Sequence, residues 1–307
     1  MILLPEAERS LVLAANAGAY FYPFAHSERT IITTPERFFA AQIIQYPDWT
    51  ALFRKIILIN GIDPRWLTQP ALLAAPNTYY FLWDPARCPH YSPGPNALAL
   101  IRKVYHTYSF QPEDCEAFGL RFNSTMYAPP PEGFLAPDAP LIHDILFLGV
   151  PKDRLPLLRE LHKSFRSAGL RAYFRIGLTP SDNLPQEQAE GWLVTREWMA
   201  YRDYLRQLNQ SRALLDLYQE IQTGFSLRAM ESLFFGKKLI TNNRALRGEY
   251  GDAPSIYHPD NIFFLDEDNI AHLPAWLERP YVPLPEAVRD YYRFERWLER
   301  FTPPPAN

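Results

Sequence analysis

The stretch Ala213–Asn243, ALLDLYQEIQTGFSLRAMESLFFGKKLITNN, decides the fold. Its continuous apolar start predicts a buried strand, and Lys238–Thr241 predicts a second one. Between them, Leu227, Met230 and Leu233 keep the spacing of one helical face. A strand, a helix and a further strand in this order indicate a parallel α/β unit.

The same alternation extends on both sides of this stretch. Asp153 is expected to cap a helix that Gly169 ends. The segment 141–284 is therefore predicted to form a doubly wound domain. Its other expected strands are Ile142–Leu148, Arg171–Ile176 and Asn261–Leu265, and a further helix is expected at Tyr201–Asn209.

The first half shows short apolar runs separated by turns, as in strands buried on both faces of a parallel sheet. We predict an N-terminal α/β domain over residues 1–130, followed by the proline-rich linker Ala128–Pro140. Residues 285–307 are predicted to form one amphipathic terminal helix that begins at Pro285, and its packing back on the N-terminal domain is an open alternative. The expected strands of this half are Ser10–Ala15, Thr30–Thr33, Lys55–Asn60 and Thr78–Trp83, with helices at Pro35–Gln45, Asn96–Lys103 and Pro112–Phe118.

Two α/β halves of this kind predict a fold of two Rossmann-like domains facing a cleft. Ligands of such sheets bind at the carboxyl ends of the strands, so a cleft between two of them suits a reaction of two substrates.

The composition excludes several classes of protein. In 307 residues, 31 Lys and Arg oppose 34 Asp and Glu, which argues against nucleic-acid binding through overall charge. Only 13 residues are Gly, and no Walker loop or complete G-x-G-x-x-G occurs. The missing dinucleotide-binding motif weakens the interpretation of the protein as a nicotinamide oxidoreductase.

The start of the chain and its cysteines bear on its location. The first ten residues carry acids where a signal peptide needs a basic leader, and no apolar run is long enough to span a bilayer. Cys88 and Cys115 are too few and too far apart for a disulfide framework or a zinc site. We expect a cytoplasmic protein, and Tyr20-Phe-Tyr-Pro-Phe24 leaves open a peripheral contact with the inner face of a membrane.

The helix that follows Thr223 and Gly224 offers an anion site. Free amides at a helix N-terminus, with the Thr223 and Ser226 hydroxyls, can bind a phosphate without a metal. Arg228 and Glu231 share a face with Gly224, so Arg228 can reach a phosphate and Glu231 a ribose diol. A surface helix with a solvated Arg228–Glu231 pair is the alternative.

This motif resembles the donor-binding segment of GT-B-type glycosyltransferases, in particular bacterial enzymes of surface-polysaccharide and lipopolysaccharide synthesis. The resemblance rests on Gln222–Leu233, on Gly236-Lys-Lys-Leu-Ile-Thr-Asn-Asn243 and on Asp144-Ile-Leu-Phe-Leu-Gly149. It implies a nucleotide-sugar donor and a glycan or lipid-linked glycan acceptor. The donor-binding residues that it implies are Gly149, Lys152, Arg154, Thr223, Gly224, Ser226, Arg228 and Glu231.

The acceptor needs a base from the other domain. Asp84 follows the strand Tyr79–Trp83 and precedes Pro85, which favours an extended backbone at the carboxyl end of that strand. Asp84 is therefore our candidate general base, and His26, after the first strand, is the alternative.

The sequence thus predicts a metal-independent glycosyltransferase without a cofactor. Asp266-Glu-Asp268 mimics a metal-binding D-x-D, but a solvated loop or cap is favoured there. A non-catalytic nucleotide- or glycan-binding module of the same fold is the alternative function.

Overall fold

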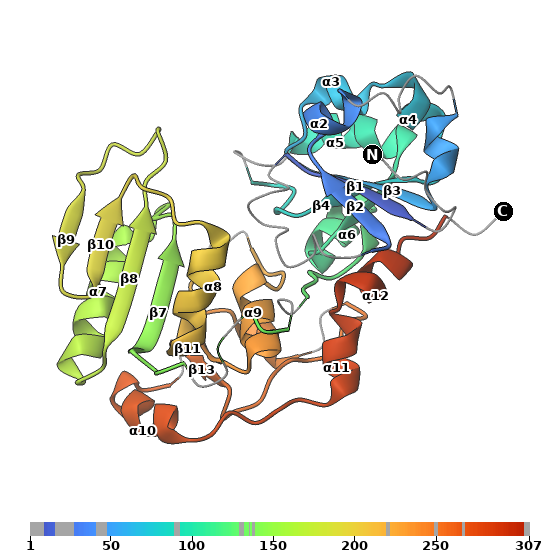
Figure 1. Cartoon of the computed structure of the whole chain (residues 1–307). Coiled ribbons are helices and arrows are strands. Elements are labelled where there is room, and N and C mark those ends of the chain that lie inside the picture. The colour runs from blue at the N-terminus through green and yellow to red at the C-terminus, as the bar shows by residue number, and fades with distance from the viewer. Residues whose placement is uncertain are drawn as a thin grey trace.

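The computed structural model describes residues 9–15, 28–40, 48–88, 93–128, 132–134, 136, 139–218, 222–248, 251–265 and 268–303. They form two α/β units, each built on its own sheet, with the last helices running from the second unit to the first (Figure 1). The predicted fold class, two doubly wound Rossmann-like domains, is confirmed.

The first sheet has the strand order β2-β1-β3-β4-β5-β6, and its described pairs are all parallel. The strands are β1 (Ser10–Leu13), β2 (Thr30–Thr33), β3 (Lys55–Ile59), β4 (Thr78–Leu82), β5 (His106–Ser109) and β6 (Arg121–Phe122). The helices of this half are α2 (Pro35–Phe39), α3 (Pro64–Leu67), α4 (Pro70–Ala74), α5 (Gly94–Val104) and α6 (Pro112–Phe118), with a 3-10 turn at Trp49–Leu52.

Both faces of this sheet are buried, which explains the continuous apolar runs in the sequence. Along β3, Ile56 and Leu58 belong to a core with α2, α4 and α5, whereas Ile57 and Ile59 belong to a core on the opposite face. The short helices α2, α3, α4 and α6 each begin at a proline, whose fixed φ suits the first helical turn.

The second sheet has the order β13-β12-β11-β7-β8-β10-β9, parallel except for the β9–β10 pair. Its strands are β7 (His143–Gly149), β8 (Ala172–Gly177), β9 (Glu187–Ala189), β10 (Trp192–Thr195), β11 (Ser211–Asp216), β12 (Lys238–Thr241) and β13 (Ile262–Phe264). The helices are α7 (Leu155–Ser167), α8 (Tyr201–Asn209), α9 (Leu227–Phe235) and α10 (Leu273–Glu278), with 3-10 turns at Arg244–Arg247 and Ile270–His272.

Local details of this half differ from the sequence prediction. The sequence does not predict the hairpin of β9 and β10, because its strands are too short for a clear apolar pattern. Asp153 does not cap α7: the residue at the N-cap is Arg154, and no side chain caps that helix. Gly236 does end α9, with the positive φ of 61° that glycine tolerates.

The predicted single terminal helix is in fact two helices, α11 (Glu286–Tyr291) and α12 (Phe294–Glu299). The break arises because Tyr127 pairs with the chain between them. Its N–H donates to the Tyr292 carbonyl at 2.8 Å, and its carbonyl accepts from the Phe294 N–H at 3.0 Å. These bonds replace the helical ones, so the chain turns before α12.

The turn directs α12 onto the first sheet. The Trp297 ring meets Phe81 of β4 edge to face, with 5.1 Å between centroids. The ammonium of Lys55 donates to the Leu298 carbonyl at 2.6 Å and to the Glu299 carbonyl at 3.0 Å, which satisfies the C-terminal end of α12. The end of the chain therefore joins the second domain to the first.

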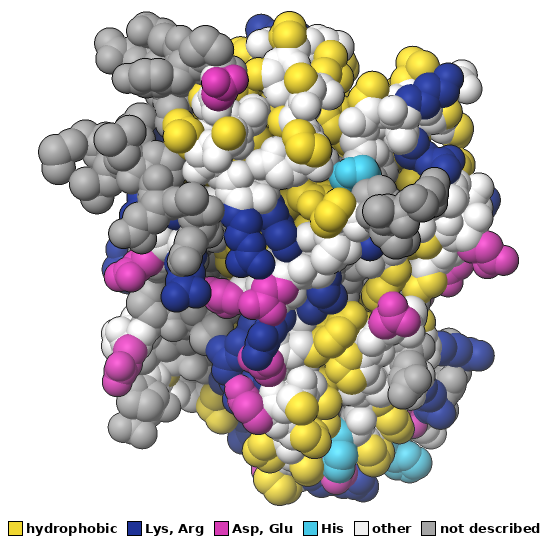
Figure 2. Space-filling view, turned by 90° about the vertical axis from the view of Figure 1, so that its right-hand side faces the viewer, with side chains coloured by type: hydrophobic (Ala, Val, Ile, Leu, Met, Phe, Trp, Pro, Cys, Tyr) yellow, Lys and Arg dark blue, Asp and Glu magenta, His cyan; other side chains and the backbone are white. Residues whose placement is uncertain are grey.

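The surface of α11 and α12 carries charges of both signs. Arg293 pairs with Glu286, and Arg296 pairs with Asp290 and Glu299. Figure 2 shows basic and acidic side chains lying side by side across the middle of the face on which these helices lie.

Two observations concern the membrane. Among the helices of the described ranges, none combines the length and apolar character that crossing a bilayer requires. The segment Tyr20–Phe24, for which a peripheral membrane contact was left open, lies outside the described residues.

A single hydrophobic core links the two domains. It contains β1, β3 and β4 side chains of the first sheet, Leu214 and Leu239 of the second, and the apolar faces of α9 and α12. At Gly224, before α9, the two domains are in close contact. A Cβ added to Gly224 would overlap the ring of Phe110, which precedes α6.

We predict that Gly224→Ala destabilises the protein by about 1–3 kcal/mol, because a Cβ cannot fit against Phe110 unless its ring and the nearby backbone shift. Thermal or urea unfolding measures this. The matched control is Gly248→Ala, since a Cβ at Gly248 meets nothing within 4 Å. Equal stability of the two variants would contradict the close approach of the domains.

Candidate functional site

The second sheet reverses its strand order between β7 and β11. Ligands of doubly wound sheets bind outside the carboxyl ends of the strands at such a switch point. Here β7 ends at Gly149 and β11 ends at Asp216. This crevice therefore lies where the motif residues are expected to act.

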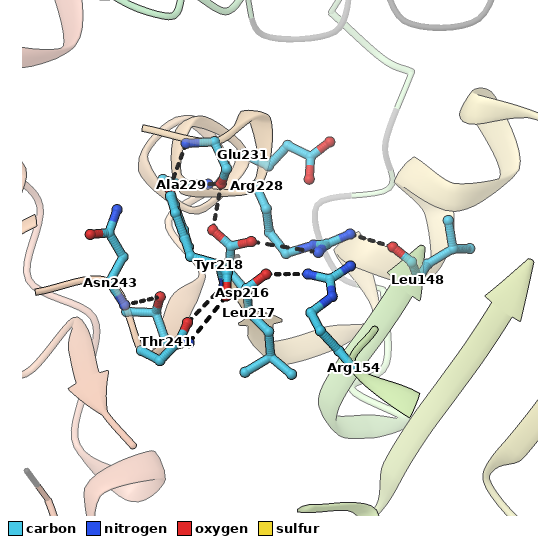
Figure 3. Close-up of polar contacts among 12 residues, drawn as sticks. Leu148, Arg154, Asp216, Leu217, Tyr218, Arg228, Ala229, Glu231, Thr241 and Asn243 are labelled. Atoms are coloured by element: carbon cyan, nitrogen blue, oxygen red, sulfur yellow. Dashed lines mark hydrogen bonds and ion pairs between the residues drawn. The ribbon is translucent and has the colours of Figure 1, made fainter. Parts of the chain in front are cut away.

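Two arginines reach into the crevice from different elements. Figure 3 shows Arg228 extending from α9 toward the Leu148 carbonyl and the Asp216 carboxylate, with 3.7 Å between its Nη1 and Asp216 Oδ1. Arg154 extends from the start of α7 to the Leu217 carbonyl and also donates to the Val150 carbonyl at 3.1 Å. Their guanidinium groups share the Phe147 ring, at 5.4 Å for Arg228 and 6.0 Å for Arg154.

Asp216 organises the start of α9. Its carboxylate accepts from the hydroxyl of Ser226, and that hydroxyl accepts from the Ala229 N–H at 3.0 Å as the N-cap of the helix. Asp216 is only 4% exposed, and its burial raises its pKa while Arg228 opposes that rise. The ion pair thus holds Arg228 at the mouth of the switch point.

The backbone N–H groups before α9 that were predicted to bind phosphate are already hydrogen-bonded within the protein. The N–H groups of Thr223 and Gly224 donate to the Gln111 Oε1, at 2.9 and 3.4 Å, and the Ser226 N–H donates to the Tyr218 hydroxyl at 2.6 Å. The expectation of free amides there is wrong for this conformation. The reason is the interface between the domains, where Gln111 takes the place expected for an anion.

In this structure, Thr223 and Gly224 therefore contact the first domain. The Thr223 hydroxyl donates to Glu113 at 2.6 Å, and Gly224 admits the Phe110 ring. Both partners flank the start of α6 in the first domain.

Glu231 lies on α9 close to Arg228, whose charge opposes the rise that burial causes in the pKa of Glu231 (Figure 3). Its carboxylate accepts from the hydroxyls of Tyr201 at 2.6 Å and Tyr204 at 2.5 Å, and the residue is 2% exposed. With both oxygens bound inside the protein, Glu231 anchors α9 to α8. The structure does not support its predicted role of holding a ribose.

The loop after β7 presents Lys152 to the other domain. Lys152 has a φ of 47°, a left-handed conformation that is uncommon for a residue with a side chain. Its ammonium group lies close enough to Asp84 of the first domain that its charge opposes the rise that burial causes in the pKa of that carboxyl group. Lys152 thus faces the cleft, whereas Arg154 lies in the crevice behind it.

The first sheet also has a switch point, between β1 and β3, and Asn60 follows β3 there. The Asn60 side chain donates to Asp84 Oδ2 at 3.1 Å and accepts from the Trp83 N–H at 2.5 Å. Asp84 follows β4 and is half-buried. Burial raises its pKa, and the bond from Asn60 and the charge of Lys152 oppose that rise.

A cavity of about 1060 Å³ joins the switch point of the first sheet to the loops that follow the strands of the second sheet. Its described lining includes Asn60, Trp83 and Asp84 from the first domain and Lys152 and Trp198 from the second. The predicted cleft between the domains is thus present, with a carboxylate and an ammonium group on opposite walls. His26, the alternative base, lies outside the described residues.

Sequence reasoning missed some residues of this region. Asn60 follows a buried strand just as Asp84 does, so its position was available as a signal. Trp198 is 60% exposed and packs against Gly177 at the end of β8, and nothing local marks it. Gln111 also carries no sequence signal, because its role depends on the meeting of two domains.

Metal binding finds no support among the residues that the structure describes. No three His, Cys, Asp or Glu side chains there are arranged to hold an ion. Asp266 and Glu267 are outside the described ranges. Asp268 accepts from the Phe264 N–H at 2.8 Å and so closes the turn after β13.

No family model matches the sequence, and no curated protein matches it significantly. Among solved structures, the glycotransferase of kitacinnamycin is similar over 96% of both chains, with 12% identity and a TM-score of 0.41. The GtfA/B complex is similar over 88% of this chain and 59% of the other, with 9% identity and a TM-score of 0.35. Similarities of this size carry no argument about activity.

The buried Glu231 predicts a pH-dependent stability. Burial raises its pKa to about 7, above the ordinary value near 4.3 of an unfolded chain. The folded state then holds the proton more tightly, so this contribution is complete below about pH 4.3 and is lost as the pH rises toward 7. Relative to Glu231→Gln, the melting temperature of the parent protein should fall across this range.

Thermal unfolding at a series of pH values measures the difference. Glu160→Gln is the control, since Glu160 is an exposed residue of α7 and should leave the pH profile unchanged. Parallel profiles of melting temperature against pH for the parent and Glu231→Gln would contradict a raised pKa of the buried Glu231 carboxylate.

Proposed function

We propose that this protein is a glycosyltransferase that moves a sugar from a nucleotide-sugar donor to a hydroxyl group of an acceptor. The observation that carries the proposal is the cavity between the two domains, with Asp84 on one wall and Lys152 on the other. One sheet would hold the donor and the other would hold the acceptor, so that both meet in one enclosed space.

The donor diphosphate fits the second domain best. Lys152 and Arg154 lie in the loop after β7, and Arg228 reaches the Leu148 carbonyl at the end of that strand. The Nε of Arg154 is buried with no hydrogen-bond partner in the described structure. Negative charge builds on the leaving diphosphate as the sugar departs, so fixed cations there stabilise the transition state more than the ground state. Because these cations supply the charge compensation, we propose transfer that does not depend on a metal.

The remaining motif residues would position this site. Ser226 and Asp216 hold the start of α9, and Thr223 and Gly224 join it to the first domain. Gly149 ends β7 with the Arg228 guanidinium next to it, at 4.0 Å from the position of an added Cβ. A side chain at Gly149 would therefore narrow the space in which a phosphate can meet Arg228.

Asp84 would act as the base on the acceptor. In the displacement, a bond forms between the acceptor oxygen and the anomeric carbon, and the bond from that carbon to the phosphate oxygen breaks. The hydroxyl proton passes to Asp84, and the electron pair leaves with the nucleoside diphosphate. A raised pKa makes Asp84 a stronger base than an ordinary aspartate, and the bond from Asn60 orients it.

The biological setting is also a proposal. The motif Gln222–Leu233 resembles enzymes of bacterial surface-polysaccharide and lipopolysaccharide synthesis. We propose an acceptor among such glycans or lipid-linked glycans, and action in the cytoplasm or at the inner face of the membrane.

Replacement of Arg228 tests the donor site. Arg228→Ala should reduce kcat/KM by about 2–4 kcal/mol of transition-state stabilisation and weaken nucleoside diphosphate binding. Calorimetry with UDP, GDP, ADP and dTDP identifies the tightest nucleotide and measures the loss. Arg159→Ala, an exposed arginine of α7 paired with Glu187, is the control. Unchanged nucleotide affinity in Arg228→Ala would show that the donor does not bind in this crevice.

Replacement of Asp84 tests the base. Asp84→Asn should keep nucleotide binding and lower kcat about a hundredfold or more. Turnover of the parent should rise with pH through the raised pKa of Asp84, and Lys152→Met should move this rise to higher pH by removing the opposing charge. Asp203→Asn, an exposed aspartate of α8, is the matched control. Near-normal turnover in Asp84→Asn would mean either that His26 is the general base or that the enzyme supplies no base.

Incubation with a panel of nucleotide sugars separates the enzyme from a binding module. Slow donor hydrolysis supports the transferase. Tight binding of a nucleotide sugar with neither hydrolysis nor transfer would favour the non-catalytic alternative, with which the occupation of the Thr223 and Gly224 amides by Gln111 agrees.

A further inference from the structure

The cavity extends well beyond Asp84 and Lys152. Its described lining runs along one side of α5, from the N-cap of the helix to its last residue. At 1.5 Å per helical residue, this side is about 16 Å long. A single sugar ring does not fill such a length, so we expect a longer ligand in this cavity. The lining residues of α5 and its N-cap include Pro93, Ala97, Leu100, Ile101 and Val104.

The walls along α5 are apolar. Leu67 of α3, Leu73 of α4 and Tyr80 of β4 also line the cavity. Leu73 is 42% exposed, Leu100 is 65% exposed and Val104 is 49% exposed. Apolar side chains left open to water within one cavity mark a surface that an apolar partner covers.

The cavity has a charged part at the cleft between the domains and an apolar part along α5. The charged side chains of its described lining are Asp63, Asp84, Lys103 and Lys152. Asp84 and Lys152 lie at the cleft between the domains, and Lys103 lies near the last turn of α5. The intervening stretch of α5 offers apolar contacts, which suit an uncharged chain and not a second polar sugar.

We propose that the acceptor is an amphiphile with one extended hydrocarbon tail. Its tail lies along α5, between that helix and α3–α4, and its hydroxyl-bearing head lies at Asp84. The position of the head rests on the proposed function, whereas the tail site rests on the cavity alone. A glycan without a tail would leave Leu73, Leu100 and Val104 against water.

Alkyl glucosides test the tail site in the absence of a nucleotide sugar. Methyl, octyl and dodecyl β-glucosides, below their micelle concentrations, should bind with affinity that rises with tail length, because each buried methylene adds about 0.8 kcal/mol. We expect dodecyl glucoside to bind at least about a hundredfold more tightly than methyl glucoside. A glucoside with a brominated tail should also quench tryptophan fluorescence, because Trp83 and Trp198 line the cavity.

Variants locate the tail on the protein. Leu100→Glu and Val104→Glu place a charge on the α5 wall at exposed positions, so the fold should be kept, and each should weaken dodecyl glucoside binding at least about tenfold. Leu157→Glu is the matched control, since Leu157 is a 41% exposed leucine of α7 that is not part of the cavity lining. Affinity independent of tail length, or equal losses in all three variants, would overturn the proposal.

Failure of the tail site and failure of the proposed function give different results. Sugar transfer with a KM that does not depend on tail length would leave the transferase intact and overturn the tail site. Tight binding of dodecyl glucoside without any transfer or donor hydrolysis would support the tail site and overturn the transferase.

Discussion

The burial of α9 between the two sheets is the constraint on which the rest of the structure depends. One face of the helix fills the core shared by both domains, with Ala229, Met230 and Leu233 among its buried side chains. Its start touches Phe110 and Gln111 of the first domain, and its C-terminal end is closed by Gly236. Because a close-packed core admits little sliding, this packing fixes where Arg228 lies relative to β7 and how the two strand edges face each other.

The buried charges follow from that placement. Asp216 and Arg228 form an ion pair away from bulk water, and Ser226 satisfies a further oxygen of the carboxylate. A buried pair of this kind costs desolvation energy, so it is weak evidence for a role in stability and suits a role in positioning. Glu231 anchors the same helix through Tyr201 and Tyr204. The helix that joins the domains is thus also the one that aims a cation at the switch point of the second sheet.

Much of the fold and part of the site could be predicted from the sequence. Continuous apolar runs such as Lys55–Ile59, and helical spacing such as that of the apolar face of α9, are local signals from which the central strands, the longer helices and the two-sheet class followed. Asp84 could be selected because it follows a strand at its carboxyl end, and Lys152 was implied by the resemblance of the motif. The break between α11 and α12 could not be predicted, since it results from pairing with Tyr127, far away in the chain.

By itself, the sequence determined the buried central strands of both sheets and the longer helices between them, because hydrophobic period, prolines and glycines act over a few residues. The tertiary structure alone decided what the polar groups of the motif contact. Gln111 occupies the amides of Thr223 and Gly224, and Tyr201 and Tyr204 take both oxygens of Glu231. These partners come from other parts of the chain, and a hydrogen bond depends on distances of a few ångströms that no local pattern encodes.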